Sequence, residues 1–144
     1  MMRFRLGFIV GLLSLTACVG PEEPLDGLIE NLPAIVSTKS AFTYSLKAND
    51  YTFDDSYPME LNAQVSSSLV MTMTVSNVGA RLDTTELTLY HAENDSVLGH
   101  YFLMTNQVQT SFLTVDSSKS NLPTRFDIRG RHYTGQIDFI LALQ

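Results

Sequence analysis

Cysteine, tryptophan and basic residues are all scarce in this sequence of 144 residues. It has one cysteine and no tryptophan, and nine lysines and arginines stand against fifteen aspartates and glutamates, for a net charge of −6. A single cysteine excludes intrachain disulfides, so a hydrophobic core must hold the fold together. The acidic balance argues against nucleic acid as a partner, because nucleic-acid-binding domains carry a basic surface.

Long hydrophobic runs and catalytic motifs are also missing. The most apolar stretch, Leu6 to Leu15, covers ten residues. As a helix it would rise about 15 Å, roughly half of a hydrocarbon core, so no membrane span is expected in the mature protein. No Gly-x-Ser-x-Gly elbow, phosphate-binding loop or dinucleotide fingerprint is present. These absences predict a protein that is not an enzyme and that carries no cofactor.

The beginning of the chain has the pattern of a signal peptide. Arg3 and Arg5 precede the apolar stretch, which ends in small residues before the cysteine. The segment Leu15-Thr16-Ala17-Cys18 resembles the lipobox of bacterial lipoproteins. That resemblance implies a diacylglyceryl group on the Cys18 sulfur and cleavage after Ala17, so residues 1–17 would be the signal peptide. The alternative is an ordinary secretory signal with a chance cysteine at its end.

Residues 18–34 read as the lipidated cysteine followed by an acidic, proline- and glycine-rich tether. The residue after Cys18 is Val19, not the aspartate that retains such lipoproteins at the inner membrane. By the same resemblance, the protein is expected at the outer membrane of a Gram-negative cell, anchored by lipid and facing the periplasm. Without the leader, seven basic residues remain against fifteen acids, a net charge of −8. Lipid, not charge, would therefore hold the protein at the membrane.

From residue 35 to 144 the apolar residues recur with a period of two, which is typical of β-strands. Phe42, Tyr44 and Leu46 alternate with small polar residues. Seven or eight short strands with polar turns predict an all-β fold, an antiparallel β-sandwich, with a small lipocalin-like barrel as the alternative. We expect residues 50–59 to form a loop, residues 97–104 a central strand, and the segments 124–129 and 136–143 a last pair around a turn at residues 130–134.

One apolar set is a candidate wall for a groove that binds a protein partner. Methionine adapts to irregular apolar surfaces, and the two methionines of this set alternate on one strand. Packing in the core is the alternative for the same side chains. The set comprises Met71, Met73, Leu87, Leu89 and Phe102.

Two histidines are weak candidates for a metal site. If residues 93–96 form a hairpin turn, His91 lies opposite Leu98 and His100 opposite Leu89, so both project from one face together with Met104. Two imidazoles and a thioether could hold copper. Packing among apolar neighbours is the stronger interpretation, and we predict no metal.

A basic cluster lies near the end of the chain. Arg125 and Arg129 alternate with apolar residues, which directs them outward, and Arg131 follows. They form a possible contact patch for phosphate groups or an acidic partner. The alternative is a solvated strand face that Asp127 partly neutralises.

Together these features predict a non-enzymatic lipoprotein that binds an envelope protein and assembles or stabilises a larger machine. Its architecture resembles that of pilotins, the small lipoproteins that carry secretins outward, although no motif is shared. The alternative is a lipoprotein that binds a small ligand, either a lipid or a metal.

Overall fold

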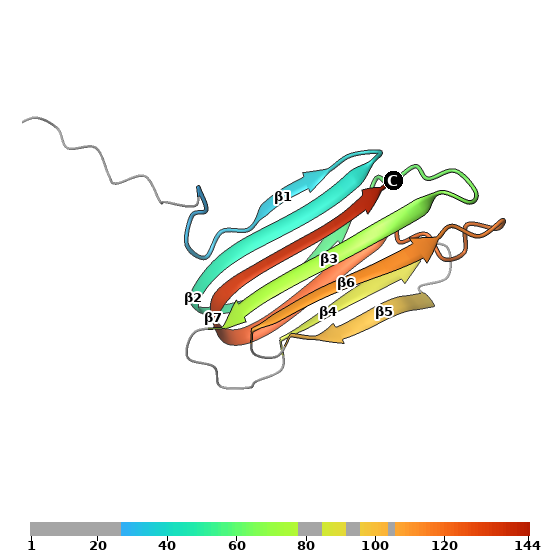
Figure 1. Ribbon diagram of the computed structural model, residues 1–144. Helices are drawn as coiled ribbons and strands as arrows, with labels where there is room; N and C mark the ends of the chain where they lie inside the picture. The colour runs from blue at the N-terminus through green and yellow to red at the C-terminus, as the bar shows by residue number, and fades with distance from the viewer. Residues whose placement is uncertain (1–26, 78–84, 92–95, 104–105) are drawn as a thin grey trace, which may run out of the picture.

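The computed structural model describes residues 27–77, 85–91, 96–103 and 106–144, and every regular element in them is a β-strand (Figure 1). No helix of the described residues is long and apolar enough to cross a membrane. The strands are β1 (Ala34–Ser37), β2 (Ala41–Pro58), β3 (Ser68–Asn77), β4 (Glu86–His91), β5 (Ser96–Phe102), β6 (Gln107–Thr114) and β7 (Arg125–Leu143).

Two long strands, β2 and β7, organise the sheet. They pair antiparallel along most of their length, and the sheet runs in the order β1-β2-β7-β3-β6, with β4 pairing β7 and β5. The C-terminal part of β7 pairs with β3, and its N-terminal part pairs with β4. The sheet therefore folds over itself into an antiparallel β-sandwich. We call β1, β3, β6 and the adjoining halves of β2 and β7 the five-stranded layer, and β4, β5 and the other two halves the four-stranded layer.

A corner in β2 and β7 carries the chain from one layer to the other. The register shifts between Ala48 and Phe53, and Asp50 has a positive φ of 49°. Across the corner, His132 also has a positive φ, 51°, and its Nδ1 lies 2.8 Å from Asp50 Oδ1. Gly130 is required there, because a Cβ atom would lie 2.7 Å from the Phe53 ring. Irregularities of this kind bend and twist a strand without ending it.

Two sequence predictions are wrong at this corner. Residues 50–59 were expected to form a loop, and residues 130–134 a turn between two strands. Instead β2 continues through Pro58 and β7 continues from Arg125 to Leu143. The polar and glycine residues that predicted a break are the ones that make the bend.

The core lies between the two layers, and its centre is aromatic. Phe42, Tyr44, Phe126 and Phe139 are fully buried. The ring centroid of Phe126, from the four-stranded layer, lies 5.0 to 5.1 Å from those of the other three. These separations are those of favourable aromatic pairs. The period-two pattern that predicted the inward face is confirmed here, and so is the sandwich.

One smaller expectation differs from the structure. The predicted central strand of residues 97–104 is β5, an edge strand that pairs only with β4 among the described residues. A bulge and Gly99 make this strand irregular. A strand with apolar residues on both of its sides can lie at the edge of a sheet as well as at its centre. Before β1, Glu30 bridges to Lys47, and the Asn31 amide donates to the Lys47 carbonyl at 2.8 Å. The chain therefore contacts the sheet a few residues before Ala34.

Candidate functional site

The candidate partner groove is not open in the structure. Met71, Met73, Leu87 and Leu89 are at most 5% exposed and pack in the core. They lie on the inward sides of β3 and β4, which face each other across the sandwich. Phe102 differs, because it is 56% exposed at the end of the edge strand β5. These five side chains therefore do not form one apolar wall.

Two of these core residues do reach an apolar cavity. It has a volume of about 240 Å³ and lies at the open side of the sandwich, between β5 and β6. An engineered apolar cavity of ~150 Å³ can hold benzene, so this one can hold a small apolar group. Burial raises the pKa of Tyr101, which contributes to the lining. The main apolar lining residues are Leu69, Met71, Leu89, Leu98, Tyr101 and Leu141.

The two histidines do not share one face. His100 lies opposite Thr88 and His91 opposite Ser96, so the predicted pairings with Leu89 and Leu98 are wrong. The cause is a register shift beside Leu89, which the sequence does not indicate. No group of three potential metal-binding His, Cys, Asp or Glu residues occurs among the described residues. Cys18 and Met104 lie outside the described residues.

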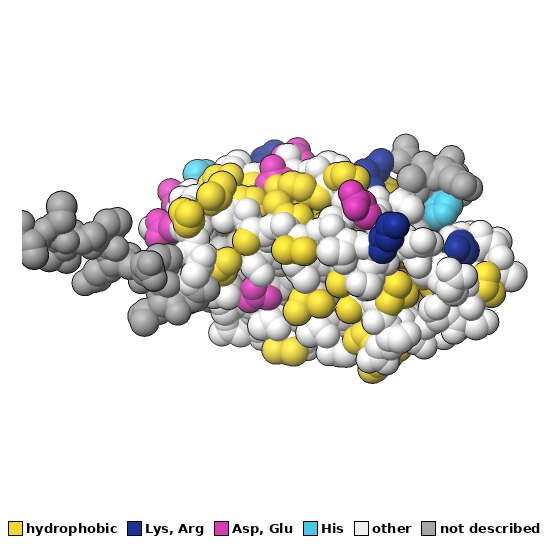
Figure 2. Space-filling model, turned by 90° about the horizontal axis from the view of Figure 1, so that it is seen from above, with side chains coloured by type: hydrophobic (Ala, Val, Ile, Leu, Met, Phe, Trp, Pro, Cys, Tyr) yellow, Lys and Arg dark blue, Asp and Glu magenta, His cyan; other side chains and the backbone are white. Residues whose placement is uncertain are grey.

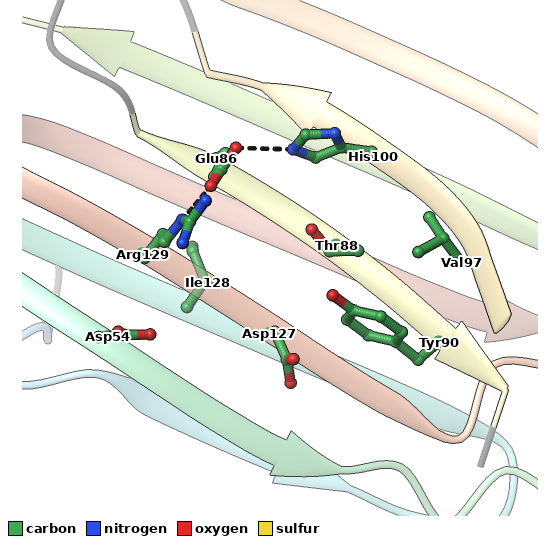
Figure 3. A pocket seen from close by; sticks show the side chains of 9 residues that line it. All are labelled: Asp54, Glu86, Thr88, Tyr90, Val97, His100, Asp127, Ile128 and Arg129. Atoms are coloured by element: carbon green, nitrogen blue, oxygen red, sulfur yellow. Dashed lines mark hydrogen bonds and ion pairs between the residues drawn. The ribbon is translucent and has the colours of Figure 1, made fainter. Parts of the chain in front are cut away.

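A buried carboxylate, Glu86, organises the outer side of the four-stranded layer (Figure 3). Its side chain lies between His100 and Arg129, which approach it from the strands on either side. His100 Nε2 lies 2.7 Å from Glu86 Oε2, and Arg129 Nε donates to Glu86 Oε1. Desolvation raises the pKa of Glu86, but the hydrogen bonds from His100 and Arg129 outweigh it and hold the pKa below its ordinary value.

Further polar pairs extend from this carboxylate along β7. Asp127 accepts a hydrogen bond of 2.6 Å from Ser56, and Arg125 Nε lies 3.2 Å from the same carboxylate oxygen. The Arg125 guanidinium carbon also lies 4.1 Å from the centroid of the Tyr90 ring, a cation–π geometry. The outer side of this layer is therefore a network of paired charges.

A shallow pocket of about 240 Å³ lies over this network. Asp54, Glu86 and Asp127 supply acids, and Arg129 and His100 supply donors, so the pocket has no strong charge of either sign. It can offer hydrogen bonds to a polar ligand. Because Glu86 is committed to two partners, it is not placed as a free general base.

The predicted basic patch of Arg125, Arg129 and Arg131 lies on the outer side of the sheet, but part of its charge is paired. Arg125 and Arg129 lie on the outer side of the sheet as predicted, but each is held by a carboxylate. Arg131 lies farther along, beside a neighbouring hollow of about 490 Å³ that also includes Arg129. Sequence reasoning anticipated the contribution of Asp127 and missed Glu86. Nothing in the sequence around Glu86 indicates that β4 pairs with β7, which begins about 40 residues later.

The outer side of the five-stranded layer is chemically different, and we call it the threonine-rich face. One row of cross-strand neighbours runs through Val36, Thr43, Ile140, Thr72 and Thr110. Along β6, Val108 is 75% exposed and Phe112 is 73% exposed. Lys47 and Asp138 are the only charged side chains that strand alternation places on the outer side of this layer, within the described residues.

No family model and no curated protein matches this chain. Solved structures match distantly. A pilus protein of Bacillus endospore appendages matches with a TM-score of 0.45, 8% identity, and coverage of 81% of this chain and 91% of its own. A family 16 carbohydrate-binding module has a TM-score of 0.42, 8% identity, and 72% and 76% coverage.

A third structural match is a carbohydrate-binding module of Cellvibrio mixtus lichenase 5A. Its TM-score is 0.40, with 14% identity and coverage of 78% of this chain and 85% of that chain. Likenesses this distant carry no inference about function. The function must be argued from the residues themselves.

Proposed function

We propose that this protein is a non-enzymatic lipoprotein of the bacterial outer membrane, facing the periplasm, that docks an envelope protein on its threonine-rich face. The lipid is carried by Cys18. The proposal has two parts, an anchor and a docking surface, and each is supported by a different part of the chain.

The anchor is supported by the sequence of the first eighteen residues. A basic start, a short apolar stretch and the lipobox-like Leu15-Thr16-Ala17-Cys18 occur in the expected order. Two or more acyl chains on one cysteine bind a membrane stably, whereas a single chain binds only marginally. The lack of any other cysteine fits a sulfur that is consumed by lipidation.

The observation that carries the docking surface is the exposure of large apolar side chains on an almost uncharged sheet face. Val36, Val108, Phe112 and Ile140 are between 44% and 75% exposed. Threonines lie between them, and these can hydrogen-bond at an interface without the large desolvation cost of a charge. Large apolar side chains this exposed, set among neutral polar ones, support an interaction site on this face.

The anchor is tested with Cys18→Ser in the full chain. The variant is expected to leave the membrane fraction or to accumulate with its leader uncut. Mass spectrometry of the wild-type protein should find acyl chains on Cys18. An unchanged membrane fraction for the variant, or a bare sulfur in the wild type, would refute the anchor.

The docking surface is tested with a photo-crosslinking amino acid at Ile140 in cells that produce the full chain. The matched control places the same group at Asp54, which is exposed on the outer side of the four-stranded layer. We expect a discrete crosslinked protein from position 140 and none from position 54. Equal or absent crosslinking at both positions would contradict the proposal.

A second function, binding of a small apolar ligand, is favoured by the cavity between β5 and β6. Its lining is mainly aliphatic, and its volume of about 240 Å³ suits part of an acyl chain or a single ring. Native mass spectrometry of the purified protein would detect a copurifying ligand. Leu89→Phe should fill the cavity and remove the ligand. Its control is Ala63→Leu, which also enlarges a core residue but one that does not line the cavity.

A further inference from the structure

The free edge of β6 lacks the sequence features that normally protect an edge strand. Its sequence, Gln-Val-Gln-Thr-Ser-Phe-Leu-Thr, has no charge and no proline, and its register with β3 is continuous over all eight residues. Within the described part of the chain, β6 pairs with β3 alone. An edge of this kind exposes unpaired backbone groups that another strand can bind.

The other edges of the sandwich are protected. β1 is only four residues long. The second half of β2, at the edge of the four-stranded layer, carries Asp54, Asp55 and Pro58. β5 is interrupted by a bulge and by Gly99, whose missing side chain leaves room for the Tyr101 ring. Short length, charge, proline and bulges are the devices by which sheet proteins avoid edge pairing. Among the edges described, only that of β6 has none of them, so β6 is the edge that a further strand can pair with.

The part of β6 that remains open to a new strand has side chains that suit pairing with a second copy of itself. The Asn121 side-chain amide donates to the Thr114 carbonyl at 2.8 Å, which closes one end and leaves residues 107–113, with Thr110 at their centre. If a second β6 pairs antiparallel about Thr110, Val108 of each copy faces Phe112 of the other. Gln109 then faces Ser111, and no like charges meet. Aromatic and β-branched cross-strand pairs of this kind stabilise a sheet.

We propose that β6 is a homodimer edge at which two copies of this chain join their five-stranded layers into one continuous sheet, with the two-fold axis at Thr110. A two-fold interface needs a self-complementary surface, and the sequence from Val108 to Phe112 provides one. The lipid anchor would confine both copies to one membrane and raise their effective concentration.

The dimer goes beyond the proposed function, and only the raised effective concentration rests on the proposed anchor. The dimer uses the backbone edge of β6 and the side chains of Val108 and Phe112, whereas the docking test uses Ile140, two strands away from β6 on the threonine-rich face. Pairing would join the two faces edge to edge, because Val108, Thr110 and Phe112 lie on the same side of the sheet as Ile140.

The test is disulfide trapping of Thr110→Cys in the full chain in cell envelopes. Directly opposed residues of an antiparallel pair have Cα atoms about 4.5 to 5.5 Å apart, within disulfide range. The control is Thr43→Cys, in the same cross-strand row but three strands away, so that its counterpart lies roughly 30 Å away. We expect the Thr110→Cys dimer to exceed that of the control about tenfold, since only opposed positions meet.

Charge exchange provides a second measurement. Thr110 is exposed, so lysine or aspartate there should leave the fold intact. Thr110→Lys alone and Thr110→Asp alone should each be monomeric by light scattering of the detergent-solubilised chain, and an equimolar mixture should dimerise. This pattern requires two copies to meet at residue 110.

Two results would overturn the dimer. One is equal crosslinking at positions 110 and 43 together with an unchanged monomer in the charge series. The other is a crosslink from position 110 to a different protein only, which would assign the edge to that protein. The wild-type chain under the same conditions tests the proposed anchor separately. A disulfide-linked dimer of the wild type would require a free thiol on Cys18 and would therefore contradict lipidation, not the β6 dimer.

Discussion

The same two strands, β2 and β7, form parts of both outer faces of this sandwich, yet the two faces have opposite chemistry. On the five-stranded layer, β2 presents Thr43 and Ser45, and β7 presents Ile140. On the four-stranded layer, β2 presents Asp54 and β7 presents Arg129. In Figure 2, seen from the β1 side, uncharged side chains dominate the lower margin, and most charged ones lie above it.

The difference teaches that charge is distributed by layer and not by strand. On the four-stranded layer, acids and bases satisfy one another, as Glu86 does with His100 and Arg129. Covering that network with a partner would require desolvating several ions, which is costly. The threonine-rich face carries almost no such cost, and the centres of protein interfaces are likewise depleted in charge.

The largest expected effect removes the contact that joins the layers. Phe126→Ala takes out a fully buried ring that packs on Phe42, Tyr44 and Phe139. We expect a loss of about 3–5 kcal/mol in the free energy of unfolding, measured by denaturant titration. Both faces should be lost in one transition. Separate transitions for the two layers would show that they are independent units.

Glu86→Ala should have an intermediate effect confined to the charged face. It removes a buried carboxylate and leaves His100 and Arg129 without their shared partner. The expected destabilisation is about 1–3 kcal/mol, because hydrogen bonds to charged groups contribute at that level. Asp54→Ala, an exposed acid on the same layer, is the matched control and should change stability little. Equal losses would mean that Glu86 is not the centre of the network.

The pH dependence of stability sharpens the role of the same carboxylate. The folded pKa of Glu86 lies below the ordinary value of 4.5, so its contribution is full above that pH. It is lost as the pH falls from about 4.5 through the folded pKa, because the unfolded state then binds the proton first. Glu86→Gln should flatten the curve of unfolding free energy in that range. A curve parallel to that of the wild type would exclude Glu86 as a source of acid sensitivity.

The smallest effect is expected on the threonine-rich face. Ile140 is 44% exposed, so Ile140→Thr should change the unfolding free energy by less than about 0.5 kcal/mol. The same substitution should weaken crosslinking to the partner from a neighbouring position such as Thr72. A stable fold with unchanged crosslinking would separate Ile140 from the docking surface.

The alternation of residues predicted much of this fold but not its bend. Phe42 and Tyr44 on one side, with Thr43 between them, identify an inward face without any structure. Asp50 and His132 carry the same local signals as loop residues, since aspartate and histidine tolerate a positive φ. Whether such a residue ends a strand or turns a corner depends on pairing with a distant strand, which no local pattern reports.

The candidate site was harder to predict for the same reason. Met71 and Met73 alternate correctly, but alternation does not tell whether an apolar side faces a core or an open groove. The partners of Glu86 lie on two other strands, and a bulge beside Leu89 sets which residue faces His100. These relations arise from tertiary pairing, so the charged network was visible in the sequence only as isolated arginines.

The pairing of β2 with β7 has a consequence for how this chain reaches its native state. Phe42 pairs with Leu141, so the central ladder joins the first part of the domain to its last few residues. Contacts between residues so far apart in sequence form late, and they make folding slower. A chain is synthesised from its amino end, so Phe42 cannot pair with Leu141 until that residue has been made, and the central ladder cannot serve as an early step of folding.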